Sequence, residues 1–406
     1  MIPYEIFTAF RFLREGRAQT WLIFIGVGVG VGVLVFLSAL ITGLQDSLIQ
    51  QTLSIQAHVV VRPPDRAPVV VRDAQDIFVG AKIEKGAERP PRIDAWTQAQ
   101  NAIDDADGVV ASAPTVAGSA FAHRGALSVS VALRGIDPAS YSRIVGLNEK
   151  LVGGRISLVG STALIGVELA RDLGLVVGDR IRLETTSGRE DIVRVGGLFD
   201  LGNKDVNQRW VFVSLREAQN LLDLSGAVST FEVRVARPFE AASAAADIAR
   251  RTGLKAEPWT ELNQQLLTAL KSQSSSSVMI QFFVILAVAL GIASVLVVSV
   301  VQKSREIGIL RATGTSVRSI TLIFLIQGLA VGVVGAIVGI SIGTVLALVF
   351  AHTAVNPDGS PTFPVDLNGM LFARAAATAV FVGLIAAVVP ARRAAKLDPA
   401  EAIRHV

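Results

Sequence analysis

The side chains that most often carry catalysis or bind metals are few and scattered in this chain. Its four histidines, His58, His123, His352 and His405, lie far apart, and no pair has the spacing of a metal site. Because there is no cysteine, a disulfide, a thiolate metal site and a cysteine nucleophile are excluded. No G-x-x-x-x-G-K-[ST] phosphate loop, G-x-S-x-G elbow or H-E-x-x-H pair occurs. We therefore expect no catalytic residue, metal site or cofactor in this chain.

One short charged segment, KSREIGILRATGTSVRS, separates two long apolar runs. In it Ile307, Leu310, Gly314 and Val317 recur at helical spacing, which predicts a single apolar stripe. Charged residues cover the remaining surface: Lys303, Arg305, Glu306, Arg311 and Arg318. A helix of this kind can lie along a membrane face and dock into a groove on a partner. A basic loop that only sets membrane topology is the alternative.

The composition predicts a membrane protein with a soluble part. Of the 406 residues, 51% are hydrophobic and only 18% are charged, which is too apolar for an ordinary soluble protein. The net charge of +4 is small, and the positive excess lies in the short segments beside the apolar runs. By the positive-inside rule these segments are cytoplasmic, so we expect both termini in the cytoplasm and residues 45–277 outside. Nothing in this distribution indicates nucleic-acid binding.

The apolar runs predict four membrane spans. The first run is too long for a signal-peptide core and should stay as an anchor. In chain order we predict a cytoplasmic amphipathic helix (1–20), a first span (21–44), an outer α+β domain with two stalk helices (45–277), a second span (278–301), the charged cytoplasmic segment (302–319), a third span (320–350), an outer loop (351–370), a fourth span (371–389) and a cytoplasmic tail (390–406). Arg374 lies close enough to the start of the fourth span to snorkel to water as an anchor.

Glycines in the first and third spans indicate close helix packing. The predicted packing positions are Gly26, Gly30, Gly328, Gly332, Gly335 and Gly339. For the first span, packing within the chain and dimerisation are both compatible with the pattern. The spans contain few strongly polar side chains, chiefly Gln281 and Gln327, so any cargo is expected to be handled by the outer domain.

The outer domain is predicted to have two lobes, with its middle part inserted between outer pieces that return to the stalks. Predicted strands are 58–61, 127–133, 180–184, 191–195, 209–213, 230–235 and 255–259, and predicted helices are 96–107, 164–173, 215–222 and 241–251. Residues 185–190 should form a tight turn. The loop 200–207 is a candidate contact edge through Gly202, Asn203, Lys204 and Asp205, with an ordinary polar loop as the alternative.

Several stretches of the sequence together resemble those of FtsX/MacB-type ABC permeases. REIGILRATG after one span resembles their cytoplasmic coupling segment, and PARRAAKLDPAEAIR resembles their C-terminal end. Nearly the whole chain is similar to the lipoprotein-releasing LolC/LolE branch. The strings that carry this similarity are FTAFRFLREGR, SALITGLQDSLIQQTLSIQAHVVV, VALRGIDP, LIGVELARDLGLVVGDRIRL, PWTELNQQLLTAL and IFLIQGLAVGVVGAIVGISIG.

The resemblance implies a type VII ABC permease of the bacterial inner membrane. Its partners would be a cytoplasmic ABC ATPase dimer that binds ATP and Mg²⁺, a second permease copy or paralogue, membrane lipid and a periplasmic carrier or adaptor. The residues that would receive the ATPase motion are Arg305, Glu306, Ile307, Leu310, Arg311 and Gly314. The stalks would then transmit this motion outward to move a lipid-anchored or amphiphilic substrate.

One departure from the LolC/LolE pattern concerns the carrier. That branch has a long arm between the two strands that follow its G-V-E-L-A stretch, whereas here only 185–190 connects them. Three alternatives therefore stay open: a MacB-like drug, peptide or glycolipid exporter with an adaptor, an FtsX-like regulator of a cell-wall hydrolase, and a membrane-anchored enzyme. The absence of any catalytic constellation disfavours the last.

Overall fold

The computed structural model describes residues 4–15, 17–64, 91–353 and 365–397. The chain divides into two compact units, Met1–Leu48 with Thr268–Val406, and Ile49–Leu267. The first unit is built from helices, and the second combines a ten-stranded sheet with short helices.

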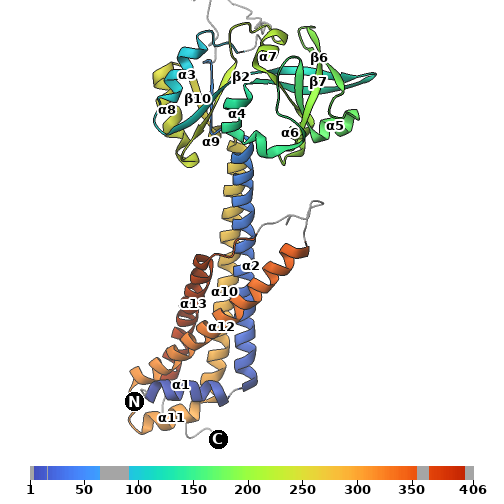
Figure 1. Cartoon of the computed structure of the whole chain (residues 1–406). Coiled ribbons are helices and arrows are strands. Elements are labelled where there is room, and N and C mark those ends of the chain that lie inside the picture. The colour runs from blue at the N-terminus through green and yellow to red at the C-terminus, as the bar shows by residue number, and fades with distance from the viewer. Residues whose placement is uncertain (1–3, 16, 65–90, 354–364, 398–406) are drawn as a thin grey trace, which may run out of the picture. The chain divides into compact units, whose positions relative to one another are not determined.

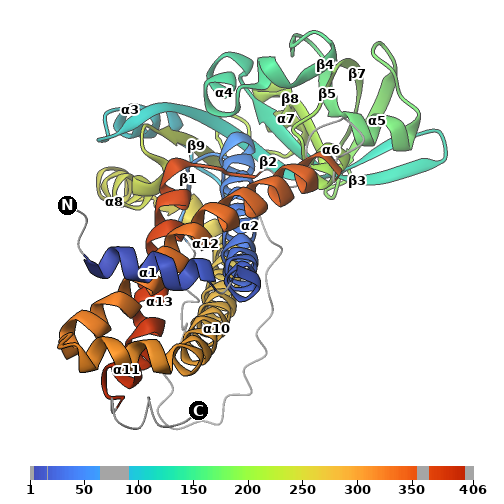
Figure 2. The same ribbon diagram turned by 90° about the horizontal axis from the view of Figure 1, so that it is seen from below.

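Four helices are long and apolar enough to cross a membrane. They are α2 (Arg17–Ile55), α10 (Gln264–Gln302), α12 (Val317–Thr353) and α13 (Gly369–Ala395). Two shorter helices, α1 (Tyr4–Glu15) and α11 (Ser304–Ala312), lie side by side at one end of the long helices (Figures 1 and 2). Each predicted span falls inside one long helix. Residues 354–364 of the predicted loop and 398–406 of the predicted tail lie outside the described residues.

Two of the long helices continue beyond their predicted spans. α2 runs without a break to Ile55 and α10 already begins at Gln264, as expected for helices that extend past the membrane. The helix α13 likewise continues past the predicted end of the fourth span at 389, through Pro390 to Ala395. Proline removes one helical hydrogen bond, but Pro390 and the alanines that follow it are buried, so packing holds the helix together there.

The second unit contains ten strands and seven α-helices among its described residues. The strands are β1 (Val59–Arg62), β2 (Val109–Arg124), β3 (Leu127–Ile136), β4 (Leu151–Gly154), β5 (Thr162–Gly166), β6 (Arg180–Thr185), β7 (Glu190–Phe199), β8 (Trp210–Ser214), β9 (Thr230–Val235) and β10 (Lys255–Pro258). The helices are α3 (Trp96–Asp104), α4 (Pro138–Val145), α5 (Val167–Leu173), α6 (Lys204–Arg209), α7 (Leu215–Leu221), α8 (Ala241–Thr252) and α9 (Trp259–Leu262).

The long strand β2 belongs to both lobes of this unit. Its first half, Val109–Thr115, pairs with β9 in the antiparallel set β10-β1-β9-β2, beside which α3 and α8 lie (Figure 1). Its second half pairs with β3 and, over Ala120–His123, with β6. Because β6 also pairs with β7, the strands β2-β3-β8-β5-β7-β6 close into a ring. The predicted α+β class is confirmed, and so is the two-lobed unit with an inserted middle part.

One predicted helix of this unit begins at the wrong residue, and one long strand was missed, each for an identifiable reason. The helix predicted over 164–173 is wrong at its start, because Leu164 and Ile165 lie fully buried in β5 and the helix begins only at Val167. A short apolar run does not distinguish a buried strand from a helix. The sequence does not predict the strand β2, because it contains many small residues together with Pro114 and Gly118, and these residues have low strand propensity. Pairing with strands distant in the chain overrides this low propensity.

The stability of this unit should depend on pH through Glu217. A hydrogen bond to Asp191 and partial burial raise the pKa of Glu217 to about 7 from 4.5. A carboxyl group with a raised folded-state pKa stabilises the fold fully below its unfolded pKa, and this contribution is lost as the pH rises through the folded pKa. Thermal unfolding of the detergent-solubilised chain should therefore shift to lower temperature between pH 5 and pH 8. Glu217→Gln should flatten that slope, while the exposed Glu149→Gln should leave it unchanged; equal slopes in all three proteins would contradict the assignment.

Candidate functional site

The predicted apolar stripe of the charged segment does not form as one helix. α11 ends at Ala312, and Gly314 adopts a left-handed conformation with φ of 99°. The Thr315 amide donates to the Leu310 carbonyl at 3.0 Å, and the Gly314 amide donates to the Arg311 carbonyl at 3.1 Å. These bonds form a Schellman motif with glycine at C′. Gly314 therefore ends the helix, and Val317 belongs to α12.

The apolar face of α11 points into the helical unit. Ile307 is fully buried in a cluster with Phe12 of α1, Phe324 of α12 and Ala394 of α13, and Leu310 packs against its edge. These two predicted coupling residues thus hold α11 on three neighbouring helices. They do not offer a docking surface of their own.

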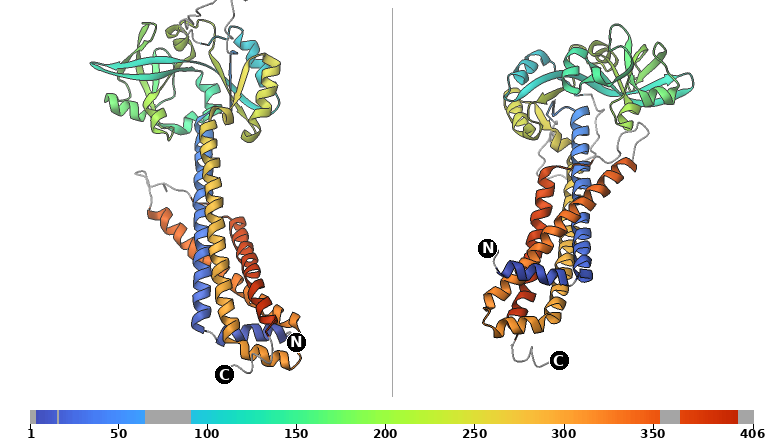
Figure 3. Two further views of the ribbon diagram at one scale, coloured as in Figure 1. Left: turned by 180° about the vertical axis from the view of Figure 1, so that it is seen from behind. Right: turned by 60° about the horizontal axis from the view of Figure 1, so that its bottom comes forward.

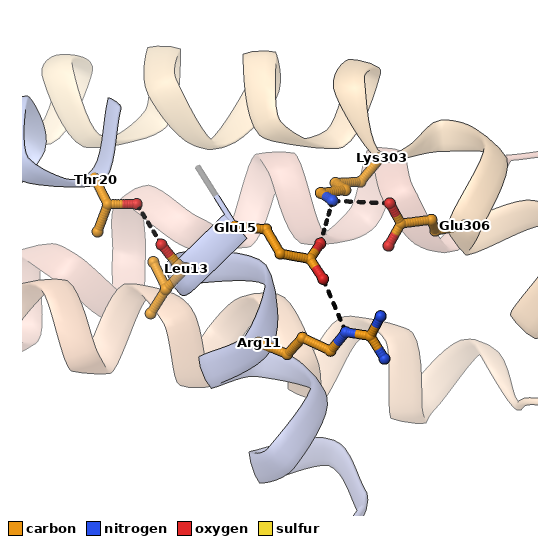
Figure 4. Close-up of polar contacts among 6 residues, drawn as sticks. All are labelled: Arg11, Leu13, Glu15, Thr20, Lys303 and Glu306. Atoms are coloured by element: carbon orange, nitrogen blue, oxygen red, sulfur yellow. Dashed lines mark hydrogen bonds and ion pairs between the residues drawn. The ribbon is translucent and has the colours of Figure 1, made fainter. Parts of the chain in front are cut away.

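Lys303, immediately before α11, connects it to α1 (Figure 4). Its Nζ donates to the Glu15 carboxylate and, at 2.8 Å, to Glu306 Oε1, while Glu15 also accepts from Arg11 Nε at 2.8 Å. The ammonium lies 5.6 Å from the centre of the Phe12 ring. The Lys303 ammonium and the Arg11 guanidinium hold the pKa of Glu15 below its usual range, and Glu15 raises the pKa of Lys303. One lysine thus bridges carboxylates from two helices.

Arg311 ties the other end of α11 to α13. Its Nη1 donates to the backbone carbonyls of Ala395 and Leu397, the latter at 3.3 Å. Ala395 is the last residue of α13 and Leu397 lies two residues beyond it, where helical partners run out, and a cation is favourable at a helix C-terminus. Arg311, predicted to contact a partner, therefore caps a helix of its own chain.

The outward surface of α11 is made by other residues. Arg305, Ile309 and Ala312 are exposed, and Ile309 has an exposed fraction of 47%. Glu306 is half-buried beside Lys303. Of the six predicted coupling residues, only Arg305 lies fully on this surface as part of the helix. The sequence analysis did not select Ile309 or Glu15 as site residues. Ile309 could have been found because it lies one helical turn after Arg305, and Glu15 because it lies four residues after Arg11.

Removing the Lys303 charge should loosen α1 from α11. Lys303→Met keeps the apolar stem but leaves Glu15 with only Arg11, so we expect a few-fold faster amide exchange in α1 and the first turn of α11. The effect should be modest, because partly exposed ion pairs are weak and screened by salt. Lys271→Met, at an exposed lysine of α10, is the matched control. Protection of α1 identical to that of the unmodified protein would show that the bridge does not hold the two helices together.

Two predicted glycines of α12 let α13 approach closely. A Cβ at Gly332 would lie 2.8 Å from the Ala379 carbonyl oxygen, and one at Gly328 would lie 2.5 Å from the carbonyl oxygen of Gly383. Contacts this short with backbone atoms leave room only for glycine. Figure 3 shows α12 and α13 adjacent along this contact.

The other two predicted glycines of α12 face α2. A Cβ at Gly335 would lie 2.4 Å from a Val27 methyl group, and one at Gly339 would lie 2.8 Å from the Gly28 carbonyl oxygen. In α2 the glycines that meet α12 are thus Gly28 and Gly32, whereas Gly30 faces Val288 of α10. Gly26 has nothing within 4 Å of its Cβ position, so among the described residues no neighbouring helix packs closely against it. Its packing against a second molecule stays a prediction.

The predicted contact loop 200–207 is only partly a loop. Asn203 caps α6 through a hydrogen bond from the Val206 amide at 3.2 Å, so Lys204 and Asp205 form the first helical turn. The Gly202 carbonyl accepts from Gln51 Nε2 of α2 at 2.7 Å. This segment is therefore held against its own unit, and a contact role stays a prediction.

The connection between β6 and β7 is a tight turn, as predicted. The Thr185 amide donates to the Arg189 carbonyl at 2.8 Å, the Gly188 amide donates to the Thr185 carbonyl at 2.9 Å, and Gly188 has φ of 78°. No long arm leaves the sheet here. Within the described ranges no three or more His, Asp or Glu side chains gather into a metal-binding group.

Two family descriptions match the chain. Residues 20–251, more than half of the 406 residues, match the MacB-like periplasmic core domain, and residues 278–399 match the FtsX-like permease C-terminal domain. The second match spans α11, α12 and α13 together with most of the apolar part of α10.

The chain is also similar to individual proteins. The lipoprotein-releasing system transmembrane protein LolC of Neisseria meningitidis serogroup B is 24% identical over 439 aligned positions, covering 100% of both chains. The macrolide export ATP-binding/permease protein MacB of N. meningitidis serogroup A is 32% identical over 114 residues, which is 28% of this chain and 17% of that protein. The crystal structure of the periplasmic region of MacB from Actinobacillus actinomycetemcomitans aligns with a TM-score of 0.34 and 12% identity, covering 53% of this chain and 94% of that one.

Proposed function

We propose a function for this chain on one premise: it belongs to the family with the MacB-like periplasmic core domain and is an ABC-type permease of the LolC, MacB and FtsX type. The proposal is that it couples ATP hydrolysis by a separate cytoplasmic ATPase to movement of its β-rich unit. Its cargo would be a lipoprotein or another lipid-anchored amphiphile, extracted from a bacterial inner membrane.

The observation that carries the proposal is that α11 is held against several other helices of its unit. α11 lies between α10 and α12 in sequence, is buried along one face, and is tied to α1 by Lys303 and to α13 by Arg311. A push on its exposed surface would therefore move several helices together, because packed helices shift as units and do not deform continuously. α2 and α10 run uninterrupted from the helical unit into the β-rich unit, so they are suited to transmit such a motion.

The proposed orientation puts both termini, α1 and α11 in the cytoplasm and residues 49–267 in the periplasm. It rests on the basic residues that flank the spans at this end, among them Arg305, Arg318, Arg392 and Arg393. The proposed assembly contains an ABC ATPase dimer, which would bind ATP and Mg²⁺, and a second permease copy or paralogue.

The lipoprotein assignment is supported by the full-length similarity to LolC. The tight turn at 185–190 supports a narrower version of it, in which cargo is not passed to a carrier through an arm between β6 and β7. A carrier or adaptor, if used, would have to contact another surface.

Reconstitution tests the proposal. The chain is co-expressed with candidate ABC ATPases of the same organism, purified as a complex and placed in proteoliposomes that contain an acylated lipoprotein. We expect ATP-dependent appearance of the lipoprotein in the soluble fraction, and none when the ATPase carries an inactive Walker A lysine. ATP hydrolysis without lipoprotein release would overturn the cargo assignment, and failure to bind any ATPase would overturn the coupling assignment.

The second candidate is a MacB-like exporter that works with a periplasmic adaptor. It is favoured by the higher identity, 32%, of a 114-residue segment to MacB. It predicts co-purification with an elongated adaptor and ATP-dependent efflux of a soluble drug or peptide. An FtsX-like regulator would instead change the activity of a cell-wall hydrolase and release no cargo.

A further inference from the structure

A cavity of about 560 Å³ lies inside the helical unit between α2, α10 and the start of α13. This volume is within the range of about 300–1,000 Å³ typical of small-molecule sites. The coupling residues described above lie elsewhere, around α11, and none of them lines this cavity. Its role is therefore independent of the partner surface.

The cavity is polar at one end and apolar at the other. Gln45 Nε2 of α2 donates to Ser274 Oγ of α10 at 3.0 Å, and Gln281 Nε2 donates to Ser38 Oγ at 3.2 Å. These two bonds set the antiparallel register of α2 and α10 and mark the polar end. Moving along α2 from Ser38 toward the N-terminus, the lining becomes apolar, with Leu34 on α2 and Ile285 on α10. This gradient suits an amphiphile.

Arg374 supplies a cation to this lining. It is the sixth residue of α13, about 7.5 Å from the helix start at about 1.5 Å per residue. Its side chain is exposed to the cavity, and among the described residues no hydrogen bond or ion pair involves its guanidinium. Arginines inside membrane spans are rare, face cavities and mark ligand pathways. With no partner among the described residues, this guanidinium is available to bind an anion.

Other polar groups of the lining are already engaged. Asn368 Oδ1 accepts from the Leu371 amide at 2.8 Å and caps α13, while Asn368 Nδ2 donates to Asp366 Oδ2 at 2.8 Å. The Asp366 carboxylate also lines the cavity, so the ligand meets both a cation and an anion. A head group that combines a phosphate with a polar or amino substituent matches this pair.

We infer that this cavity binds a phosphate-bearing lipid, with the phosphate on Arg374 and one acyl chain along the apolar end beside Leu34 and Ile285. Guanidinium and phosphate form charge-assisted, bidentate hydrogen bonds, which are strong in a site partly shielded from water. The site goes beyond the proposed function, because a lipid bound here would occupy the helical unit whichever cargo the permease moves.

Native mass spectrometry of the detergent-purified full chain tests the inference without any ATPase. The probes are palmitoyl-oleoyl phosphatidylethanolamine, the matching phosphatidylglycerol, the matching diacylglycerol and glycerol 3-phosphate. We expect both phospholipids to stay bound, and both diacylglycerol and glycerol 3-phosphate to bind at least roughly tenfold more weakly, because each lacks one half of the interaction.

Variants locate the binding. Arg374→Gln should reduce phospholipid occupancy roughly tenfold, whereas Arg374→Lys should retain most of it. Thr42→Phe, which fills the cavity from α2, should reduce it as well. The controls are Ile25→Phe, at an exposed site of α2 outside the cavity, and Arg305→Gln, and both should bind as the unmodified chain does.

Two outcomes would overturn the inference. If Arg374→Gln and Thr42→Phe keep full occupancy while their thermal unfolding matches the unmodified chain, the bound lipid is only annular. If glycerol 3-phosphate binds as well as the phospholipids, the site takes a free anion and the acyl part is wrong. Because the assay needs neither ATP nor cargo, its result is separate from that of the transport assay.

Discussion

Replacing Gly332 with valine is expected to destabilise the helical unit strongly. A Cβ at this position would lie 2.8 Å from the Ala379 carbonyl oxygen and 2.9 Å from the Val380 Cα. Both are backbone atoms of α13, so the contact cannot be relieved by a change of rotamer, and the two helices must separate. Overpacking typically costs about 1–3 kcal/mol, and we expect the upper end of this range. The measurement is equilibrium unfolding of the full chain in detergent.

The matched control is Gly26→Val, in the neighbouring helix α2. It adds the same side chain to a membrane-spanning glycine, but nothing lies within 4 Å of its Cβ position. We expect stability close to that of the unmodified protein. If both variants unfold alike, close α12–α13 contact at Gly332 does not limit the stability of this unit.

If the chain works with an ABC ATPase as proposed, replacing Ile309 with glutamate is expected to weaken their association about 30-fold. Ile309 is 47% exposed on the outward surface of α11, next to Arg305. Burial of such an apolar side chain at the centre of an interface typically contributes about 2 kcal/mol, which a carboxylate would forfeit. The dissociation constant of the purified complex is the measurement, with ATP-dependent release as the second readout.

Two further variants separate a lost contact from a damaged helix. Ile307→Ala removes a fully buried side chain from the α1–α11–α12–α13 cluster and should lower the unfolding free energy by about 2–5 kcal/mol. Ile309→Glu should leave unfolding unchanged. Val159→Glu also places a glutamate at an exposed apolar residue, a valine that is 80% exposed in the β-rich unit. The affinity for the ATPase should be unchanged in this control. Unchanged affinity in Ile309→Glu would remove α11's outward surface from the proposed interface.

Local patterns predicted most of the secondary structure. The four long helices follow from unbroken apolar runs, and the β6–β7 hairpin and the β9-α8-β10 unit follow from alternation and turn residues within a few positions. The secondary-structure predictions fail where the local sequence is compatible with more than one structure. Leu164 and Ile165 read as the start of a helix but are buried in β5, and Gly118 and Pro114 concealed the long strand β2.

For the charged segment around α11, the sequence by itself determined that a short basic stretch lies between two long apolar runs, because charge and hydropathy are properties of neighbouring residues. Only the tertiary structure decided which of its faces is free. Ile307 turns inward, Arg311 caps a helix whose end is 84 residues away, and Lys303 reaches an acid 288 residues earlier. In the same way, spacing revealed glycines in two apolar runs, but only the contact between helices shows that Gly28 packs against α12 while Gly26 meets no described residue. Periodicity determines which residues share a face, whereas the partner of that face depends on residues distant in the chain.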